Sequence, residues 1–212
     1  MSRGGEGRGQ ELTTTSYAIL GLLALRPWST YELAQQMGRS MRLWWPRAES
    51  RVYEEPKRLA RLGLATVRDE GVGRRPRSVY RITTAGRKAL EQWLGEPAAP
   101  FRMEFEAMLK VFFADQGTRE QLLGNIAAVR KWAEGEREHG RRFYASYLAD
   151  GGPFPERLHV IALATDLYER MLDAAQSWAD DAERAVARWP STRDAPDRAE
   201  EARARLRHRL GG

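Results

Sequence analysis

Apolar and polar residues follow helical patterns from residue 15 to residue 63 of the chain. Residues 15–26 are almost continuously apolar, which predicts a short buried helix that stops before a proline. The next segment opens with Ser29 and Glu32, whose spacing is that of a capping box at the start of a second helix. We expect Gly38 to end this second helix, because glycine readily adopts the left-handed conformation of a helix terminus.

A third apolar pattern follows, in which Val52, Leu59 and Leu62 share one face of a helix that Gly63 closes. Pro56 interrupts this pattern, since a proline in a helix interior costs about 3 kcal/mol. The pattern leaves two alternatives. Either the helix begins late enough for the proline to lie in its first turn, or the helix is kinked there.

Two short β-like segments, residues 64–68 and 78–82, flank a loop that contains glycine and proline, a pattern typical of a β-hairpin. Thr83 or Thr84 then caps a last helix. Residues 15–95 therefore follow the order helix, helix, helix, strand, strand, helix. This order predicts a winged helix-turn-helix domain with three helices and a two-stranded wing.

Residues 95–100 have the composition of a linker, and the apolar pattern beyond them is helical. Over residues 158–189 it becomes a heptad seam of roughly 30 residues, a length typical of coiled-coil-like packing. The apolar stripe is too wide for one neighbour, so we expect it to contact both another helix of the same chain and a second copy. Residues 101–189 are therefore predicted to form a helical dimerisation domain, with a bundle inside one chain as the alternative. The chain as a whole is predicted to be mainly α-helical.

The residues that we assign to dimerisation recur at spacings of three and four along this seam. They are Leu158, Ile161, Tyr168, Leu172, Ala175, Ala179 and Ala182. The small alanines would permit a close approach of two helices. A second apolar row lies beside the seam and consists of Leu163, Leu167, Met171, Ala174 and Trp178.

The two ends of the chain and its overall composition limit the class of protein. Residues 1–14 are glycine-rich and predict a disordered lead-in, and residues 190–212 form a polar tail in which a short basic helix can be expected. The 212 residues include no cysteine, so disulfides and thiolate metal sites are excluded. The longest apolar run has nine residues, against the roughly 20 that a membrane-spanning helix needs. A cytoplasmic protein with no membrane partner is the simplest expectation.

Charge is distributed unevenly between the two halves. Residues 1–95 contain 17 Lys and Arg against 9 Asp and Glu, a net charge of +8, whereas residues 96–212 contain 18 against 20, a net charge of −2. This asymmetry indicates that the first half faces a polyanion, although a solvated basic surface would give the same count. The positions of the charges must therefore decide between the two.

These positive charges lie where a winged helix-turn-helix contacts duplex DNA. Arg47, Arg51, Lys57, Arg58 and Arg61 belong to the helix after the turn and its approach, which is the helix that enters the major groove. The loop of the hairpin contains Arg74, Arg75 and Arg77. Since arginine bonds phosphates bidentately or enters a narrow minor groove, we expect this loop to contact the DNA backbone. The side chains of Tyr31 and Gln35 are further candidates for phosphate contacts, and Tyr53 is a candidate for a phosphate or base-edge contact, with capping of the small core as the alternative.

Little in the sequence suggests other chemistry. Trp44, Trp45 and Trp93 are candidates for a pocket that binds a small-molecule effector, although packing in the core is the alternative. The three histidines, His139, His159 and His208, lack the spacing of metal ligands, so we expect no metal site. The sequence contains no phosphate-binding glycine loop and no nucleophile motif. We therefore expect neither an enzyme nor a cofactor.

Three segments of the first half resemble the PadR family of bacterial transcriptional regulators: "SYAILGLLALRPWSTYELAQQM", "WWPRAESRVYEEPKRLARLGLA" and "GRRPRSVYRITTAGRKALEQWL". As in the family, Tyr53 stands ten residues before Gly63 and a leucine, although Glu54 takes the place of a frequent proline. The segment "FRMEFEAMLKVFFAD" resembles the start of the helical region of the larger family members. The resemblance implies a homodimeric repressor of transcription that a small molecule or another signal releases. It also implies that Ser50, Arg51 and Tyr53 face DNA and that Arg74 and Arg75 contact it from the wing.

Two other classes of function remain open at this point. An architectural DNA-binding protein would need the same basic surface but no effector. An interaction protein with a winged helix that no longer binds DNA would account for Glu54, Glu55 and the unusual place of Pro56. DNA affinity measured with and without cell metabolites separates the architectural protein from a regulator, and a gel shift with DNA from upstream of the chain's own gene identifies the interaction protein.

Overall fold

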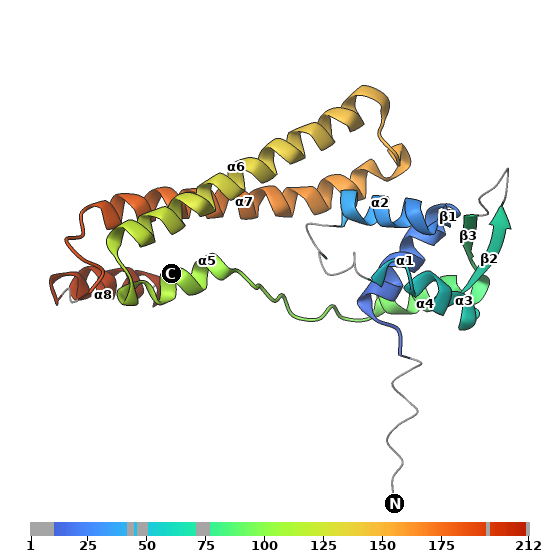
Figure 1. The fold of residues 1–212 in the computed structure, drawn as a ribbon, viewed down its shortest axis with the longest axis horizontal. Coiled ribbons are helices and arrows are strands. Elements are labelled where there is room, and N and C mark those ends of the chain that lie inside the picture. The colour runs from blue at the N-terminus through green and yellow to red at the C-terminus, as the bar shows by residue number, and fades with distance from the viewer. Residues whose placement is uncertain (1–10, 42–44, 46–50, 71–76, 194–195, 211–212) are drawn as a thin grey trace, which may run out of the picture. The chain divides into compact units, whose positions relative to one another are not determined.

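The computed structural model describes all residues except 1–10, 42–44, 46–50, 71–76, 194–195 and 211–212 (Figure 1). The chain divides into two compact units, Met1–Phe101 and Arg102–Gly212, and each is described by itself. The first unit contains the helices α1 (Thr14–Leu25), α2 (Thr30–Ser40), α3 (Glu55–Arg61) and α4 (Thr84–Gly95). The second is helical in all of its regular elements that the structure describes, so the prediction of a mainly helical chain is confirmed.

The sheet of the first unit has three strands, not the two that we predicted. β1 (Trp28–Ser29), β2 (Ala65–Glu70) and β3 (Arg77–Ile82) pair antiparallel in the order β1-β3-β2. β1 has only two residues, too few to produce a recognisable alternation in the sequence. Because β3 is the central strand, its neighbouring residues Val79 and Tyr80 are both buried.

The core of the first unit joins α1, α2 and α3 to this sheet. Its fully buried side chains include Ile19, Leu20, Leu33, Met37 and Leu59. The helical arrangement with a small antiparallel sheet confirms the predicted winged helix-turn-helix fold.

The helix boundaries follow most of the predicted signals. In the capping box at the start of α2, the N–H of Ser29 donates to Glu32 Oε2 at 2.8 Å, and the N–H of Glu32 donates to Ser29 Oγ at 3.3 Å. The Ser29 hydroxyl also donates to Glu32 Oε2 at 2.7 Å, and this bond, together with the one from the Ser29 N–H, lowers the pKa of Glu32. The charge of Arg26 lowers the same pKa further. Gly63 has φ +73° and ends the third helical segment as expected. The prediction for Gly38 was wrong, because α2 continues past it to Ser40.

The position of Pro56 decides between the two alternatives left open by the sequence. α3 begins at Glu55, so the proline lies in the first turn, where its missing N–H has no helical partner to lose. The helix is therefore shorter than the apolar pattern suggested. Val52 is fully buried but precedes the helix, and Arg51 and Tyr53 lie in the turn before it.

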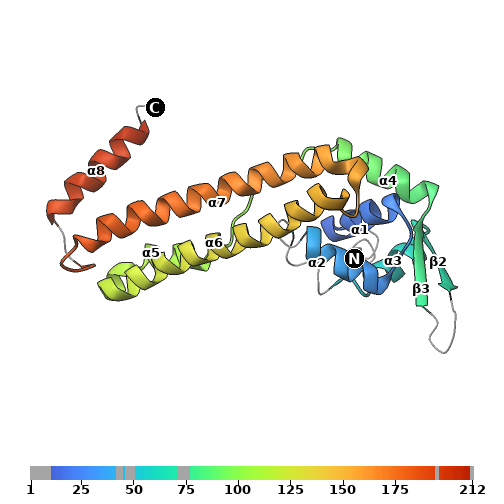
Figure 2. The same cartoon turned by 90° about the horizontal axis from the view of Figure 1, so that it is seen from above.

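The second unit is built on two long helices that run side by side, as both views show (Figures 1 and 2). These are α6 (Arg119–Asp150) and α7 (Leu158–Ala187). The shorter elements of the unit are α5 (Glu106–Phe112), the 3-10 helices η3 (Ala114–Gln116) and η4 (Pro155–Arg157), and α8 (Pro196–Leu210). No helix among the described residues is long and apolar enough to cross a membrane.

Within one chain, the predicted heptad seam packs mainly on α6. Tyr168, Leu172 and Ala179 are buried, and Leu172 and Ala179 have no exposed surface at all. Ala179 and Val186 belong to the same core cluster as Leu122, Ile126 and Val129 of α6, with Ala175 and Ala182 packed around it. Our assignment of Leu172 and Ala179 to contacts with a second copy is therefore corrected, because α6 already covers them.

Hydrogen bonds and ion pairs also join α6 to α7. Arg130 Nε donates to Asp180 Oδ1 at 2.9 Å, and its guanidinium also pairs with Glu183. The Tyr144 hydroxyl donates to Glu169 Oε1 at 2.7 Å. Burial, together with this hydrogen bond, raises the pKa of Tyr144 to about 12, so the phenol remains a donor at neutral pH.

Candidate nucleic-acid interface

The third helix presents basic and aromatic side chains on its exposed side. Lys57 and Arg61 are exposed four residues apart on α3, so they share one face of the helix. Arg51 and Tyr53 are exposed in the turn before it, Tyr53 with 54% of its surface accessible. Lys57 Nζ donates to Glu54 Oε1 at 2.8 Å, and this bond raises the pKa of the lysine. The predicted contacts Arg47 and Ser50 lie outside the described residues.

The opposite side of α3 holds a buried polar cluster that the sequence did not reveal. Glu55 is only 8% exposed, and its Oε1 accepts hydrogen bonds from Ser16 Oγ at 2.5 Å and from Arg58 Nη1 at 2.7 Å. Arg58 Nη2 donates to the carbonyl of Glu11 at 2.7 Å. The expectation that Arg58 faces DNA is therefore replaced by an internal role, since this arginine binds a buried carboxylate.

The second helix adds a polar pair on its surface. Tyr31 is 65% exposed, and Gln35, one turn later, is also exposed. Gln35 Nε2 donates to the Tyr31 hydroxyl at 2.8 Å. Both predicted residues are thus accessible on one face of α2, and the phenol oxygen keeps its own proton to donate to a phosphate.

Both strands of the described part of the wing carry exposed arginines, although only β3 has a net positive charge. Arg77 is exposed at the start of β3 and lies opposite Glu70 in the strand register. Arg68 on β2 and Arg81 on β3 are exposed as well, and Arg81 pairs with Glu70 at 3.6 Å. Neither arginine was among the predicted DNA contacts, and the burial along the two strands does not alternate in a way that would have indicated them. Arg74 and Arg75 lie outside the described residues.

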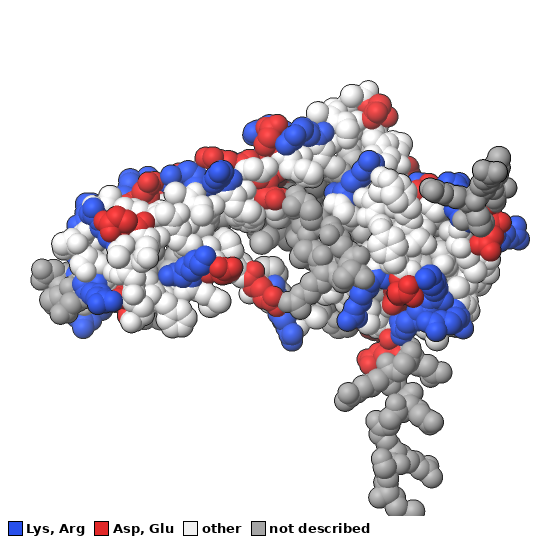
Figure 3. All heavy atoms as spheres, viewed as in Figure 1, with Lys and Arg blue, Asp and Glu red and all other residues white. Residues whose placement is uncertain are grey.

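The surface charges of the first unit are mixed in sign. Figure 3 shows lysine and arginine side chains gathered over the region of α3 and α4, with acidic side chains beside them. Glu54 is one such acid, with 76% of its side chain exposed, whereas Glu55 is turned into the core. Only one of the two adjacent glutamates therefore opposes the approach of a polyanion.

The tryptophans proposed for an effector pocket have packing partners where the structure describes them. Trp93 stacks on Tyr17 with ring centroids 4.7 Å apart. Trp45 is 40% exposed, and its Nε1 donates to Thr15 Oγ1 at 3.0 Å. Trp44 lies outside the described residues. The pocket itself stays a prediction.

The second unit exposes two groups of large apolar side chains. The first, which we call the α5 patch, consists of Leu109, Phe112 and Phe113, which are 61%, 77% and 58% exposed. The second, the α7 patch, consists of Val160, Leu163 and Leu167. The α7 patch includes Leu163 and Leu167, the first two residues of the second apolar row. The sequence pattern therefore identified this row, but we assigned dimerisation to the heptad seam beside it.

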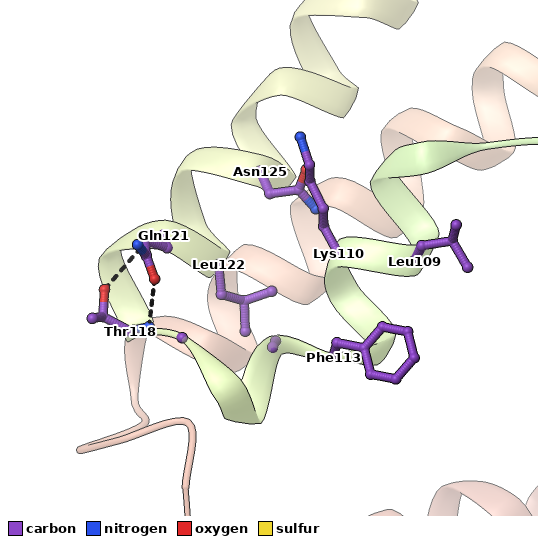
Figure 4. Close-up of a pocket in the computed structure, with 9 residues that line it drawn as sticks. Leu109, Lys110, Phe113, Thr118, Gln121, Leu122 and Asn125 are labelled. Carbon is purple, nitrogen blue, oxygen red and sulfur yellow. Dashed lines mark hydrogen bonds between the residues drawn. The ribbon is translucent and has the colours of Figure 1, made fainter.

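A cavity of about 620 Å³ lies beside the α5 patch, between α5, η3 and the first turns of α6 (Figure 4). Leu109, Phe113 and Leu122 contribute apolar surface, and Lys110 and Asn125 contribute polar groups. Asn125 Nδ2 donates to the carbonyl of Ala107 at 2.9 Å, which ties α6 to α5 at this place. Thr118 and Gln121 at its edge are joined by the capping box of α6. No group of metal-ligating side chains occurs in the described part of the chain.

Comparison with known proteins shows which family this chain is similar to. Residues 19–92 match the model of the transcriptional regulator PadR-like family. The negative transcriptional regulator PadR of Bacillus subtilis (strain 168) is 30% identical over 107 residues, which are 50% of this chain and 59% of that protein. The match therefore spans less than two thirds of that relative's length.

Solved structures of the same relative have the same fold. The crystal structure of Bacillus subtilis PadR in complex with operator DNA has a TM-score of 0.69 and 22% identity, over 82% of this chain and 99% of that chain. The crystal structure of Bacillus subtilis PadR in complex with p-coumaric acid has a TM-score of 0.63 and 20% identity, over 84% of this chain and 100% of that chain. The likeness thus extends over both units.

Proposed function

Because residues 19–92 match the transcriptional regulator PadR-like family, we propose that this protein represses transcription as a DNA-bound homodimer and is not an enzyme. The observation that carries the proposal is the exposed basic face formed by Lys57 and Arg61 on α3, together with the exposed Arg77 on the wing of the same unit. In a winged helix-turn-helix these are the elements that meet the major groove and the backbone. The operator bound by Bacillus subtilis PadR supports the same use of the fold.

The homodimer is proposed on the exposed apolar surface of the second unit. Leu163 is 74% exposed and Phe112 is 77% exposed, and exposed apolar patches of this kind mark interaction sites. A two-fold dimer would bind two inverted half-sites about 34–36 Å apart, one turn of duplex. In this proposal the α5 and α7 patches form the contact surface of the homodimer, and the fully buried Leu172 and Ala179 do not take part in it.

The DNA surface is tested by the dependence of binding on salt. The probe is a duplex that the wild-type protein selects from a random-sequence pool. Replacing Lys57, Arg61 and Arg77 by glutamine should reduce the slope of log K against log salt by about 0.9 for each lost phosphate contact, up to about 2.7 in all. The control replaces Arg141, Arg142 and Arg170, exposed arginines of the second unit, and should leave the slope unchanged. An unchanged slope in the first variant would remove this face from the DNA surface.

A small aromatic acid is the proposed effector, since Bacillus subtilis PadR has been crystallised with p-coumaric acid. The same binding measurement, repeated with p-coumaric acid, should give weaker affinity for the selected duplex. Trp44, Trp45 and Trp93 remain the candidate residues for this effector site. Affinity that stays constant at saturating p-coumaric acid would contradict this class of effector.

A further inference from the structure

The buried carboxylate of Glu55 stands at the first residue of α3, the helix that the proposed function assigns to the major groove. A buried charge is stable only when it is paired and hydrogen-bonded, and Glu55 obtains both from Ser16 and Arg58. Ser16 belongs to the first turn of α1 and has no exposed surface. The cluster therefore links α3 to α1 across 39 positions of sequence.

This link supplies what α3 lacks by itself. The helix has seven residues and no side-chain cap at its N-terminus, so it cannot hold its orientation through its own hydrogen bonds. Its buried Leu59 and Pro56 contribute apolar contacts, which are non-directional and tolerate rotation. A hydrogen bond weakens steeply with angle, so the bonds at Glu55 favour one rotation of the helix about its axis.

Rotation of α3 decides where its exposed side chains point. Lys57 and Arg61 lie about 200° and 240° around the helix from Glu55, on the side away from the cluster. At a helix radius of about 5–6 Å, a rotation of 10° moves a side chain by about 1 Å. A displacement of this size is enough to disrupt a hydrogen bond to a base edge, whereas a flexible contact to a phosphate adapts to it.

We propose that Glu55 is a positioning residue for DNA recognition, which fixes α3 on α1 through Ser16 and Arg58 and thereby sets the sequence preference of the protein. This inference rests on the proposed DNA-binding function. It reverses the expectation from the sequence, in which Glu55 weakened the case for DNA binding. Glu55 does not touch DNA in this proposal and acts only through the orientation of Lys57 and Arg61.

The experiment measures affinity for two duplexes, the one selected by the wild-type protein and a scrambled duplex of the same composition. The variants Glu55→Gln and Ser16→Ala should each reduce the ratio of the two affinities at least tenfold, at a temperature where both are folded. Ser16 is fully buried on α1, so its effect cannot arise from a lost DNA contact. Glu91→Gln, at an exposed glutamate of α4, is the matched control for charge. Thr13→Ala is the control for the capping box that Thr13 and Ser16 form at the start of α1, and both controls should leave the ratio within twofold of wild type.

A double variant separates positioning from stability. Glu55→Met/Arg58→Met fills the same space without polar groups, and apolar replacement of a buried ion pair is often neutral or stabilising. We expect the melting temperature of this variant to be no lower than that of the wild type. We still expect its ratio of affinities for the selected and scrambled duplexes to fall at least tenfold. A preserved ratio in all three variants, or a parallel fall of both affinities, would overturn the positioning role while leaving DNA binding intact. If the wild-type protein selects no duplex, the proposed function and this inference both fail.

Discussion

Thr83 satisfies two backbone groups with one hydroxyl at the start of α4. Its Oγ1 accepts from the N–H of Gly86 at 3.0 Å and donates to the carbonyl of Gly63 at 2.8 Å. We expect Thr83→Ala to lower the free energy of unfolding by about 1–2 kcal/mol, as the loss of an N-cap does. Thr84→Ala, an exposed change one residue later, should stay within about 0.5 kcal/mol. Urea denaturation followed by tryptophan fluorescence measures both, and equal losses would contradict the assignment of the cap.

Single residues were predictable from sequence where their partners are local. The capping box of Ser29 and Glu32 and the helix stop at Gly63 depend on neighbours within a few positions, and the structure confirms both. Thr83 and not Thr84 caps α4, and its hydroxyl also donates to the carbonyl of Gly63, 20 positions away, which the sequence pattern did not reveal. Glu55 was misjudged for the same reason, because its burial depends on Ser16 in another helix. Local spacing contains no information about such partners.

Two leucines on α7 distinguish the face that folding buries from the face that remains open. Leu172 has no exposed surface, whereas Leu163 is 74% exposed on the same helix. Leu172→Ala should lower the free energy of unfolding by about 2–5 kcal/mol, because it leaves a cavity. Leu163→Ala should change it by less than about 0.5 kcal/mol when the protein is dilute enough to be monomeric. Chemical denaturation at low protein concentration measures both, and a large loss at Leu163 would show that its row is buried within one chain.

At the scale of elements, the sequence predicted which residues share a face but not what covers that face. The heptad seam and the second row on α7 are both apolar, and nothing in their spacing shows which one packs on α6. The deciding factor is the tertiary packing of α6, where Leu122 and Ile126 meet Ala179. The order of helices and strands was recovered because each has its own period. β1 was missed because two residues have no period.

The arrangement of the two apolar patches constrains how two copies of the chain can pair. The α5 patch belongs to the helix that is tied to α6 at Asn125, and the α7 patch lies near the contact of Glu169 with Tyr144 of α6. These two contacts are 19 residues apart on α6, or about 29 Å at 1.5 Å per residue. In a two-fold dimer each contact occurs twice. We therefore expect an antiparallel pairing in which the α5 patch of each copy packs on the α7 patch of the other.

Mixing two variants tests this pairing directly. Leu163→Glu and Leu109→Arg should each abolish the homodimer, since each places a charge against a leucine in both contacts. In a mixture of the two variants, one contact joins glutamate to arginine and the other restores leucine against leucine, so a heterodimer should form. Sedimentation velocity measures the species, with Leu94→Glu, at an exposed leucine of the first unit, as a control that stays dimeric. Two monomeric variants that remain monomeric on mixing would show that the α5 and α7 patches do not meet across the two-fold axis.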